Sequence, residues 1–382
     1  MAGIVVGTMA IIIIISVMNG FTQLIGVFYS DFDPDLKITP VEGKMFDPSE
    51  INTQAIKNMP DVAHYAQVIE EVAMLKYGKQ QYPATVKGVP PNYPEYTNIN
   101  KILIEGEYYL EKQGINYAVV GRGVANYLGV GVSFLEPIHI YVPKKGRQFS
   151  LNPSRSINHD YVFPAAVFAV LEDIDAQYIL VSDEYATQLF ESGNEISAIE
   201  LDLTNDADVA KIQKQIQEIV GNSFHVKNKE QQHELVFKTM KSEKWVIYFI
   251  LVFILLLASG NMIGNLTMLY IDKKEDISIL LSMGMSKDKI NRIFLYEGWL
   301  ISLIGGIIGT ILGIFVCWLQ IHFELIKLPG ANDSFVISAY PVQIMPFDIL
   351  LAFLAVLGIG FLASWYPVKF MSPKHIASSN IN

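Results

Sequence analysis

Four long stretches of the chain contain no charged residue, and they give the first expectation about its fold. They run from Met1 to about Tyr29, Trp245 to Ile271, Gly298 to Ile321 and Ile349 to Val368. A helix that crosses a bilayer needs about 20 consecutive apolar residues. Buried helices of soluble proteins are usually shorter and keep a polar face. The pattern therefore predicts four membrane-spanning helices, at residues 1–29, 245–271, 296–321 and 349–368.

The residues between the first and second stretches have a different pattern. Residues 30–244 contain short β-rich runs such as "IHIYVP" and "AIELDL", bounded by Gly, Pro, Asn or Asp. Between them lie helical patterns with acidic starts, such as "DADVAKIQKQIQEIVG". This mixture predicts an α+β domain of two intertwined subdomains, inserted between the first two spans.

The distribution of basic residues predicts the topology. Residues 272–292 contain five of them, and the tail at 369–382 adds Lys369 and Lys374. The segment 322–348 has one lysine and three carboxylates. Short Lys/Arg-rich loops stay in the cytoplasm, whereas large domains cross regardless of charge. The sequence therefore predicts a multi-pass α-helical membrane protein with residues 322–348 and a large mixed α+β domain outside the cytoplasm.

Composition excludes some functions. The net charge of −10 argues against nucleic acid, which needs a basic surface. The histidines are scattered without metal-ligand spacing, and we find no catalytic constellation. The phosphate-binding pattern Gly-x4-Gly-Lys-Ser/Thr does not occur, so any ATP site would lie on another chain. The first stretch begins at Met1 with no polar residue before it, and we expect that a short cytoplasmic segment precedes it in the natural protein.

A short amphipathic helix is predicted in the segment 272–292. Ile277, Leu280, Leu281 and Gly284 recur at helical spacing and give one apolar face. Gly284 can end this helix in a left-handed turn, and Ser286 can cap the next one. Such a helix could lie on the lipid surface or dock into a partner protein.

A second segment, 143–164, is basic and poor in apolar residues, and it lies between two strand-like runs. It could be a solvated hairpin loop or an arm that docks an acidic partner. In the third span, Gly305, Gly309 and Gly313 form a small-residue stripe that we expect to pack on the second or fourth span.

Several stretches resemble the permease subunits of the lipoprotein-releasing ABC transporter, LolC/LolE type, within the FtsX/MacB-like superfamily. They are "SVMNGF" followed by "DFDPDLKITPVEGKMF", the block from Lys238 to Gly298, and the tail "ASWYPVKFMSPKHIA". The resemblance covers the whole chain. It implies an inner-membrane permease of a Gram-negative bacterium that extracts lipoproteins and passes them to a periplasmic chaperone.

The resemblance also implies partners and sites. A separate ATPase subunit would hold ATP and Mg, and this chain would be non-catalytic and bind no cofactor. A second permease subunit, identical or different, would complete a lipid cavity. The implied ATPase-coupling residues are Lys274, Glu275, Ile277, Leu280, Leu281 and Gly284. Those of the lipid cavity are Met9, Ile13, Val17, Phe249, Phe253, Leu256, Asn261 and Asn265. Those of the chaperone contact are Phe149, Pro153 and Arg155.

Two alternative functions stay open at this point. A MacB-like efflux or secretion permease would have a similar arrangement of spans. An FtsX-like signalling scaffold would move no substrate and would act on cell-wall hydrolases. The two asparagines of the second span could also serve only to join helices, because buried amides in lipid often pair with another helix.

Overall fold

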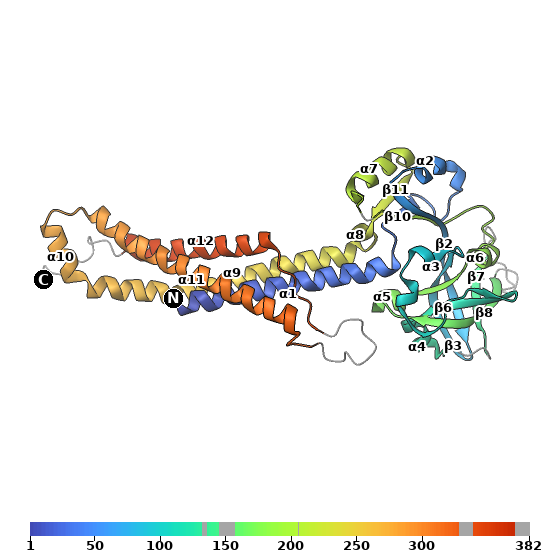
Figure 1. Cartoon of the computed structure of the whole chain (residues 1–382), viewed down its shortest axis with the longest axis horizontal. Coiled ribbons are helices and arrows are strands. Elements are labelled where there is room, and N and C mark those ends of the chain that lie inside the picture. The colour runs from blue at the N-terminus through green and yellow to red at the C-terminus, as the bar shows by residue number, and fades with distance from the viewer. Residues whose placement is uncertain (132–135, 145–156, 205, 328–338, 371–382) are drawn as a thin grey trace. The chain divides into compact units, whose positions relative to one another are not determined.

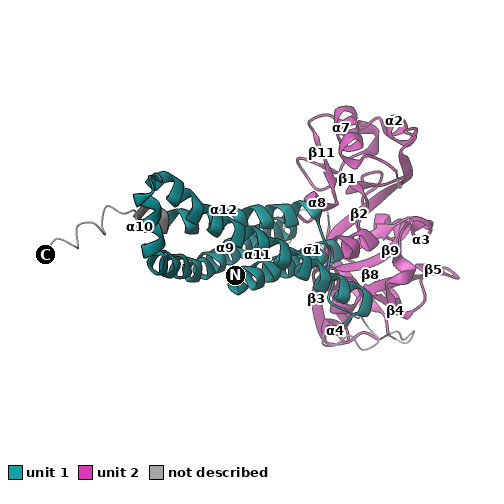
Figure 2. Cartoon of the chain, turned by 60° about the vertical axis from the view of Figure 1, so that its left-hand side comes forward, with its two compact units in different colours: residues 1–24, 235–382 teal, residues 25–234 magenta. Residues whose placement is uncertain are grey.

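The structure, a computed structural model, describes residues 1–131, 136–144, 157–204, 206–327 and 339–370. The chain divides into two compact units (Figure 2). Residues 1–24 and 235–382 form the helical unit, and residues 25–234 form the sheet unit.

The helical unit contains four long helices and one short one (Figure 1). Its elements are α1 (Ala2–Phe32), α9 (Glu234–Asp272), α10 (Lys274–Ser282), α11 (Lys287–Phe323) and α12 (Pro346–Phe370). α1, α9, α11 and α12 are each long and apolar enough to cross a membrane. They extend beyond the uncharged windows because polar residues at their ends continue the helix. For the same reason the segment 272–292 divides between α10 and the first turns of α11.

The core of the helical unit is built from α1, α9 and α12, and α11 packs against α1 through its glycine stripe. A Cβ atom on Gly309 would lie 2.6 Å from the backbone oxygen of Val5, and one on Gly313 would lie 3.0 Å from Ile12 Cβ. A Cβ atom on Gly305 would lie 3.2 Å from Ile4 Cγ2. The prediction that this stripe packs on the second or fourth span is therefore wrong. The spacing of four requires close approach of some helix but does not specify which one.

The sheet unit contains a mixed sheet of eleven strands among its described residues, in the order β11-β1-β10-β2-β3-β9-β6-β8-β4, with β5 and β7 paired to its side. The strands are β1 (Leu36–Pro40), β2 (Val62–Tyr77), β3 (Gln80–Val89), β4 (Leu103–Gly106), β5 (Glu111–Lys112), β6 (Ile115–Gly121), β7 (Ile138–Pro143), β8 (Ile157–Phe168), β9 (Tyr178–Ser182), β10 (Ala198–Leu203) and β11 (Phe224–Asn228). The α-helices are α2 (Thr53–Lys57), α3 (Tyr93–Tyr96), α4 (Arg122–Leu128), α5 (Glu172–Asp175), α6 (Asp183–Leu189), α7 (Val209–Val220) and α8 (Lys229–Gln232).

The long strand β2 belongs to two lobes of this unit. Its first half pairs with β10, and its second half pairs with β3 and β7. One hydrophobic core gathers around β1, β10, β11 and α7, and we call this part the β1 lobe. The other gathers around β3, β6, β8 and β9, and we call it the β3 lobe. Two cores that share a strand agree with the predicted α+β domain of two subdomains.

Candidate functional site

The short helix α10 ends in a tight turn that joins it to α11 without slack. The Met285 N–H donates to the Leu280 carbonyl and the Gly284 N–H to the Leu281 carbonyl, both at 3.0 Å. This pair of bonds is the Schellman motif, which needs a left-handed residue after the helix. Gly284 supplies it with φ +90°, so the predicted left-handed turn is confirmed. Ser286 occupies the N-cap position of α11, although its side chain makes no capping hydrogen bond.

One face of α10 packs against the chain itself. Ile277 is buried in a cluster with Tyr270, Ile290 and Phe294 at the adjoining ends of α9 and α11. The rings of Tyr270 and Phe294 lie 5.1 Å apart. Leu281 is half-buried against the same cluster. These apolar contacts hold α10 on α9 and α11, so the three helices form one packed block.

The opposite face of α10 is exposed. Its two large apolar side chains are those of Ile279 and Met283, 59% and 79% exposed. Lys274 and Glu275 are exposed as well, and Leu280 is half-buried. Of the coupling residues expected from the sequence, Ile277 therefore faces inward. Its contact with a partner stays a prediction, and Ile279 and Met283 are the apolar side chains that a partner could reach.

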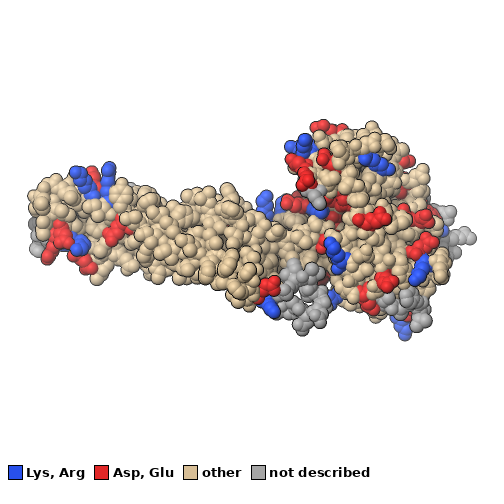
Figure 3. All heavy atoms as spheres, in the orientation of Figure 1, with Lys and Arg blue, Asp and Glu red and all other residues tan. Residues whose placement is uncertain are grey.

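α9 carries a broad apolar face that the described helices leave uncovered. Phe249, Phe253 and Leu256 are 71%, 61% and 48% exposed. A Cβ atom on Gly260 or Gly264 would meet nothing within 4 Å. The surface of the helical unit in Figure 3 has a long section without Lys, Arg, Asp or Glu. Such a surface must be covered by lipid or by another protein.

The other expected cavity residues lie in two environments. Asn261 and Asn265 are exposed next to the glycines of this α9 face. Met9, Ile13 and Val17 of α1 are only half-exposed, because α1 is packed among the other helices. Of the eight expected residues, those of α9 are therefore the exposed ones, and the role of all eight in a lipid cavity stays a prediction.

The chain segments at the two junctions of the sheet unit are bound tightly to each other and to the sheet. Asp33, just after α1, accepts a 2.6 Å bond from His233, just before α9. His233 also stacks on Tyr29 at 3.8 Å, and the Tyr29 hydroxyl donates to Asp173 at 2.6 Å. Lys229 forms an ion pair with Asp35 at 2.8 Å. These contacts hold the entry and exit segments together, and no local sequence pattern predicts them.

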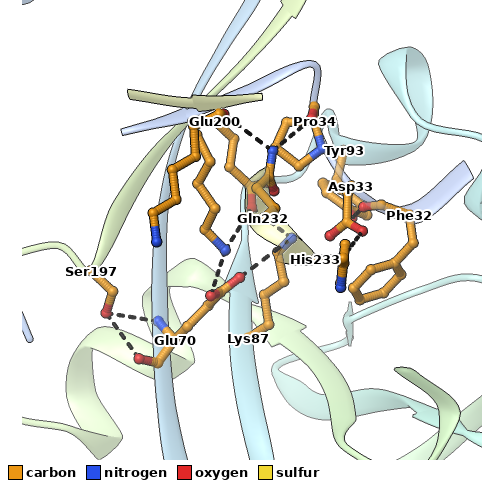
Figure 4. A network of polar contacts seen from close by, with 12 residues as sticks. Phe32, Asp33, Pro34, Glu70, Lys87, Tyr93, Ser197, Glu200, Gln232 and His233 are labelled. Carbon is orange, nitrogen blue, oxygen red and sulfur yellow. Dashed lines mark hydrogen bonds and ion pairs between the residues drawn. The ribbon is translucent and has the colours of Figure 1, made fainter. Parts of the chain in front are cut away.

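Beside these junctions lies a buried ion-pair network (Figure 4). Lys87 Nζ lies 2.7 Å from Glu200 and 3.5 Å from Glu70, and Lys37 lies 2.7 Å from Glu70. Lys87 is 1% exposed and lies 5.0 Å from the centre of the Phe32 ring. Its position therefore ties the end of α1 to the middle of the sheet.

The network stays charged over a wide pH range. Burial alone would lower the pKa of Lys87, but Glu200, Tyr93 and Glu70 outweigh it and hold that pKa well above its ordinary value. Burial alone would raise the pKa of Glu70, but the two lysines lower it. Among the residues that the structure describes, no group of three or more His, Cys, Asp or Glu side chains could hold a metal ion.

Comparison with known proteins gives the family. A family model described as the MacB-like periplasmic core domain matches residues 1–219, more than half of the chain. The chain belongs to this MacB-like family. A second model, the FtsX-like permease C-terminal region, matches residues 248–376. The two matches place the chain among membrane permeases with a MacB-like periplasmic domain.

Several curated members of this family are similar over nearly their whole length. LolC, the lipoprotein-releasing system transmembrane protein of Buchnera aphidicola (subspecies Schizaphis graminum), is 29% identical, with 98% of this chain and 92% of the relative covered. LolC of Xylella fastidiosa (strain Temecula1) is 23% identical, with 96% and 88% covered. LolE of Haemophilus influenzae is 23% identical, with 99% and 93% covered.

One expected site of this MacB-like chain cannot be placed. Phe149, Pro153 and Arg155, the candidate chaperone contacts, lie outside the described residues. The strands that flank them, β7 and β8, pair antiparallel from Ile138↔Val162 to Pro143↔Ile157. The segment 144–156 therefore connects the two strands of a hairpin, and its contact with a chaperone stays a prediction.

Proposed function

We propose that this chain is a permease subunit of an ABC transporter that releases lipoproteins from the inner membrane of a Gram-negative bacterium and passes them to a periplasmic chaperone. The observation that carries the proposal is the similarity to LolC and LolE over nearly the full length of both partners. It is supported by the MacB-like and FtsX-like matches in the same chain.

The proposed orientation follows from charge. α10 and the tail after α12 lie in the cytoplasm, because residues 272–292 contain five Lys and Arg residues and residues 369–382 contain Lys369 and Lys374. The sheet unit and the segment 322–348 then lie in the periplasm. At the end of α11 before this segment, Trp318 stacks on His322, and His322 meets Phe323 edge-on. An aromatic group at a helix end, with Trp in it, is typical of the membrane–water interface.

The chain itself is proposed to be non-catalytic and to bind no cofactor, with ATP and Mg on a separate ATPase subunit. The exposed face of α10 is proposed to contact that subunit. Ile279 and Met283 would enter an apolar groove, and Lys274 and Glu275 would make polar contacts at its edge. Because the inner face of α10 is packed on α9 and α11, a displacement of α10 would move both spans.

The open face of α9 is proposed to line the lipid cavity together with a second permease subunit, identical or different. Phe249, Phe253 and Leu256 offer an apolar wall to the acyl chains of a lipoprotein. Leaving the bilayer for water costs about 0.8 kcal/mol per methylene, so an acyl chain needs apolar contact along its whole route. Closure of the cavity against α9 would expel the chains toward the chaperone.

Depletion of the protein in its native cell tests the proposal. Membranes would be fractionated after depletion, and the location and acylation of outer-membrane lipoproteins would be measured. We expect fully acylated lipoproteins to accumulate in the inner membrane. Normal delivery of lipoproteins, with failure of drug efflux or of cell separation instead, would contradict lipoprotein release and favour a MacB-like exporter or an FtsX-like scaffold.

The coupling role of α10 has its own test. Met283→Asp puts a charge on a side chain that is 79% exposed, so folding should be unaffected. We expect the ATPase subunit to copurify with this variant about tenfold less than with the parent chain, because a buried unpaired charge costs several kcal/mol. Leu235→Asp is the matched control, since Leu235 is 80% exposed at the other end of α9. Equal copurification of both variants would contradict the α10 contact.

A further inference from the structure

The stretch "SVMNGF", residues 16–21 of α1, forms the seat for the segment that leads into α12. The Ser16 carbonyl accepts a hydrogen bond from the Gln343 N–H at 2.9 Å. Gly20 lies directly against the backbone of Pro341, where any Cβ atom would clash. The ring of Phe21 meets that of Tyr340 edge-on at 5.7 Å. These contacts fix the middle of α1 to the segment that leads into α12.

At the centre of this seat is Asp348, in the first turn of α12. The side chain is only 10% exposed, and it accepts three hydrogen bonds. Asn19 Nδ2 of α1 lies 2.6 Å from Oδ2, and Lys244 Nζ of α9 lies 2.9 Å from the same atom. The Tyr248 hydroxyl of α9 donates to Oδ1 at 2.9 Å. We call Asn19, Lys244, Tyr248 and Asp348 the Asp348 cluster, and it joins three helices through one carboxylate.

The chemistry of the cluster does more than hold helices together. The rest of the core between α1, α9 and α12 is mainly apolar, and apolar packing is not directional, so it resists separation more than sliding or rotation. Hydrogen bonds to a carboxylate need defined distances and angles, and a charged partner makes them stronger. The cluster therefore fixes the positions of α1 and α9 along α12. An apolar contact at the same place would not.

We propose that Asp348 is a positioning residue of the transport cycle, and this rests on the proposed function. A displacement that enters at α10 reaches α9 through the cluster of Tyr270, Ile277 and Phe294. At the other end of α9, Lys244 and Tyr248 are bound to Asp348, and Asp348 is bound to Asn19 of α1. The Asp348 cluster makes α1, α9 and α12 move together. Without it α1 and α12 lose their directional link to α9, and less of the work of ATP hydrolysis reaches α1.

The test compares ATP hydrolysis with lipoprotein release in the purified complex of this chain, its second permease subunit and the ATPase, reconstituted in lipid vesicles. Asp348→Asn removes the charge and keeps the shape. We expect release to fall about tenfold while ATP hydrolysis stays within about twofold of the parent complex, the range of coupling changes seen for residues that touch neither ligand. Tyr248→Phe removes one of the three bonds and should lower release by about threefold.

Restoration of the pair provides the decisive readout. The double variant D348K/K244D exchanges the two charges, so that α12 and α9 again carry opposite charges. We expect it to recover most of the release that D348K alone or K244D alone loses. Thr22→Val is the matched control on α1, because Thr22 bonds only to the carbonyl of Met18 in its own helix among the contacts of the described residues. Its release should equal that of the parent complex.

Three results would overturn the proposal. Release by Asp348→Asn at the parent level would show that the cluster positions nothing. Parallel loss of release, ATP hydrolysis and thermal stability, without recovery in D348K/K244D, would show a purely structural role. A Thr22→Val variant as defective as Asp348→Asn would show that this part of α1 is only generally sensitive. Failure of the proposed function is distinguishable, because the parent complex would then release no lipoprotein.

Discussion

The lysine–carboxylate centres at Lys87 and at Lys244 have different surroundings. In the sheet unit, Lys87 and Glu200 are 1% and 3% exposed and lie on β3 and β10, the strands on either side of β2. In the helical unit, Lys244 and Asp348 are 30% and 10% exposed and join the ends of separate helices. The first pair is enclosed by a sheet whose strands cannot move apart without breaking it. The second joins elements that can shift as bodies. The same chemistry therefore fixes a shape in one unit and relative positions in the other.

The largest expected effect comes from breaking the enclosed pair. Lys87→Met leaves Glu200 buried with Lys37, 3.7 Å away, as its remaining cation. Breaking a buried pair costs about 3–5 kcal/mol, so the free energy of unfolding of the sheet unit should fall by about 3 kcal/mol. All four tryptophans, Trp245, Trp299, Trp318 and Trp365, belong to the helical unit. The near-UV circular dichroism of tyrosine should therefore report the lower stability of the sheet unit. Tryptophan fluorescence should stay unchanged.

A surface pair provides the control for that experiment. Lys44 forms an ion pair with Glu71 at 2.8 Å, but its side chain is 77% exposed. Exposed pairs contribute about 0–1 kcal/mol, so Lys44→Met should leave the unfolding of the sheet unit nearly unchanged. Equal effects of the two substitutions would mean that burial of the Lys87 pair does not matter.

The next largest effect is expected in the helical unit, where the tryptophan signal should change and the tyrosine signal of the sheet unit should not. Gly309→Ala places a Cβ atom 2.6 Å from the Val5 carbonyl and pushes α11 from α1. Overpacking costs about 1–3 kcal/mol, so the tryptophan transition should shift to lower temperature while the tyrosine signal of the sheet unit stays. Gly358→Ala is the control, because nothing lies within 4 Å of its Cβ position. A similar loss in both variants would contradict the packing of α11 on α1.

The smallest expected effect is on the pH dependence of stability, and it comes from Asp202, two residues after Glu200 on β10. Burial, with the charges of Asp35 and Glu200, raises the pKa of Asp202 to about 6. The folded state then binds more protons than the unfolded state between about pH 4 and 6, so stability falls as pH rises through that range. Asp202→Asn should remove this fall and raise the stability of the sheet unit by about 1–2 kcal/mol above pH 6, with no gain at about pH 4.

The network around Lys87 provides the contrast in the same titration. The pKa of Glu70 is lowered and that of Lys87 is raised, so their contribution to stability is lost only at strongly acidic or strongly basic pH. Any change in stability between pH 4 and 6 that persists in Asp202→Asn must have another origin. Asp175 is the next candidate, because burial raises its pKa to about 6.

A structural feature can be predicted from the sequence when the residues that determine it are close together along the chain. Gly284 was predicted to adopt a left-handed turn because only the residues next to it determine that turn, and its φ is +90°. The long helices follow from uncharged runs for the same reason. Ile277 was grouped with the exposed coupling residues because periodicity identifies an apolar face but not what covers it. The contacts within the chain decide that question.

Asp348 shows the limit most clearly. In the sequence it stands just before the uncharged run that predicts the fourth span, so it was counted among the acidic residues of the loop 322–348. Its partner Asn19 is 329 positions away along the chain, and no local pattern connects the two. The stretch "SVMNGF" supported a family resemblance, yet its physical role, as the seat of the segment before α12, is visible only in three dimensions.

The strand shared by the two lobes also determines the order in which the chain can fold as it is made. Every strand of the β3 lobe among the described residues has been synthesised once residue 182 has been added. The β1 lobe cannot close then, because β1 pairs with β10 and β11, and β11 ends at Asn228. Its N-terminal strand, β1, has no partner strand until β10 follows about 160 residues later, which is a long loop to close. The β3 lobe is thus a nested insertion that folds first, and the last strand of the β1 lobe emerges just ahead of the second membrane helix.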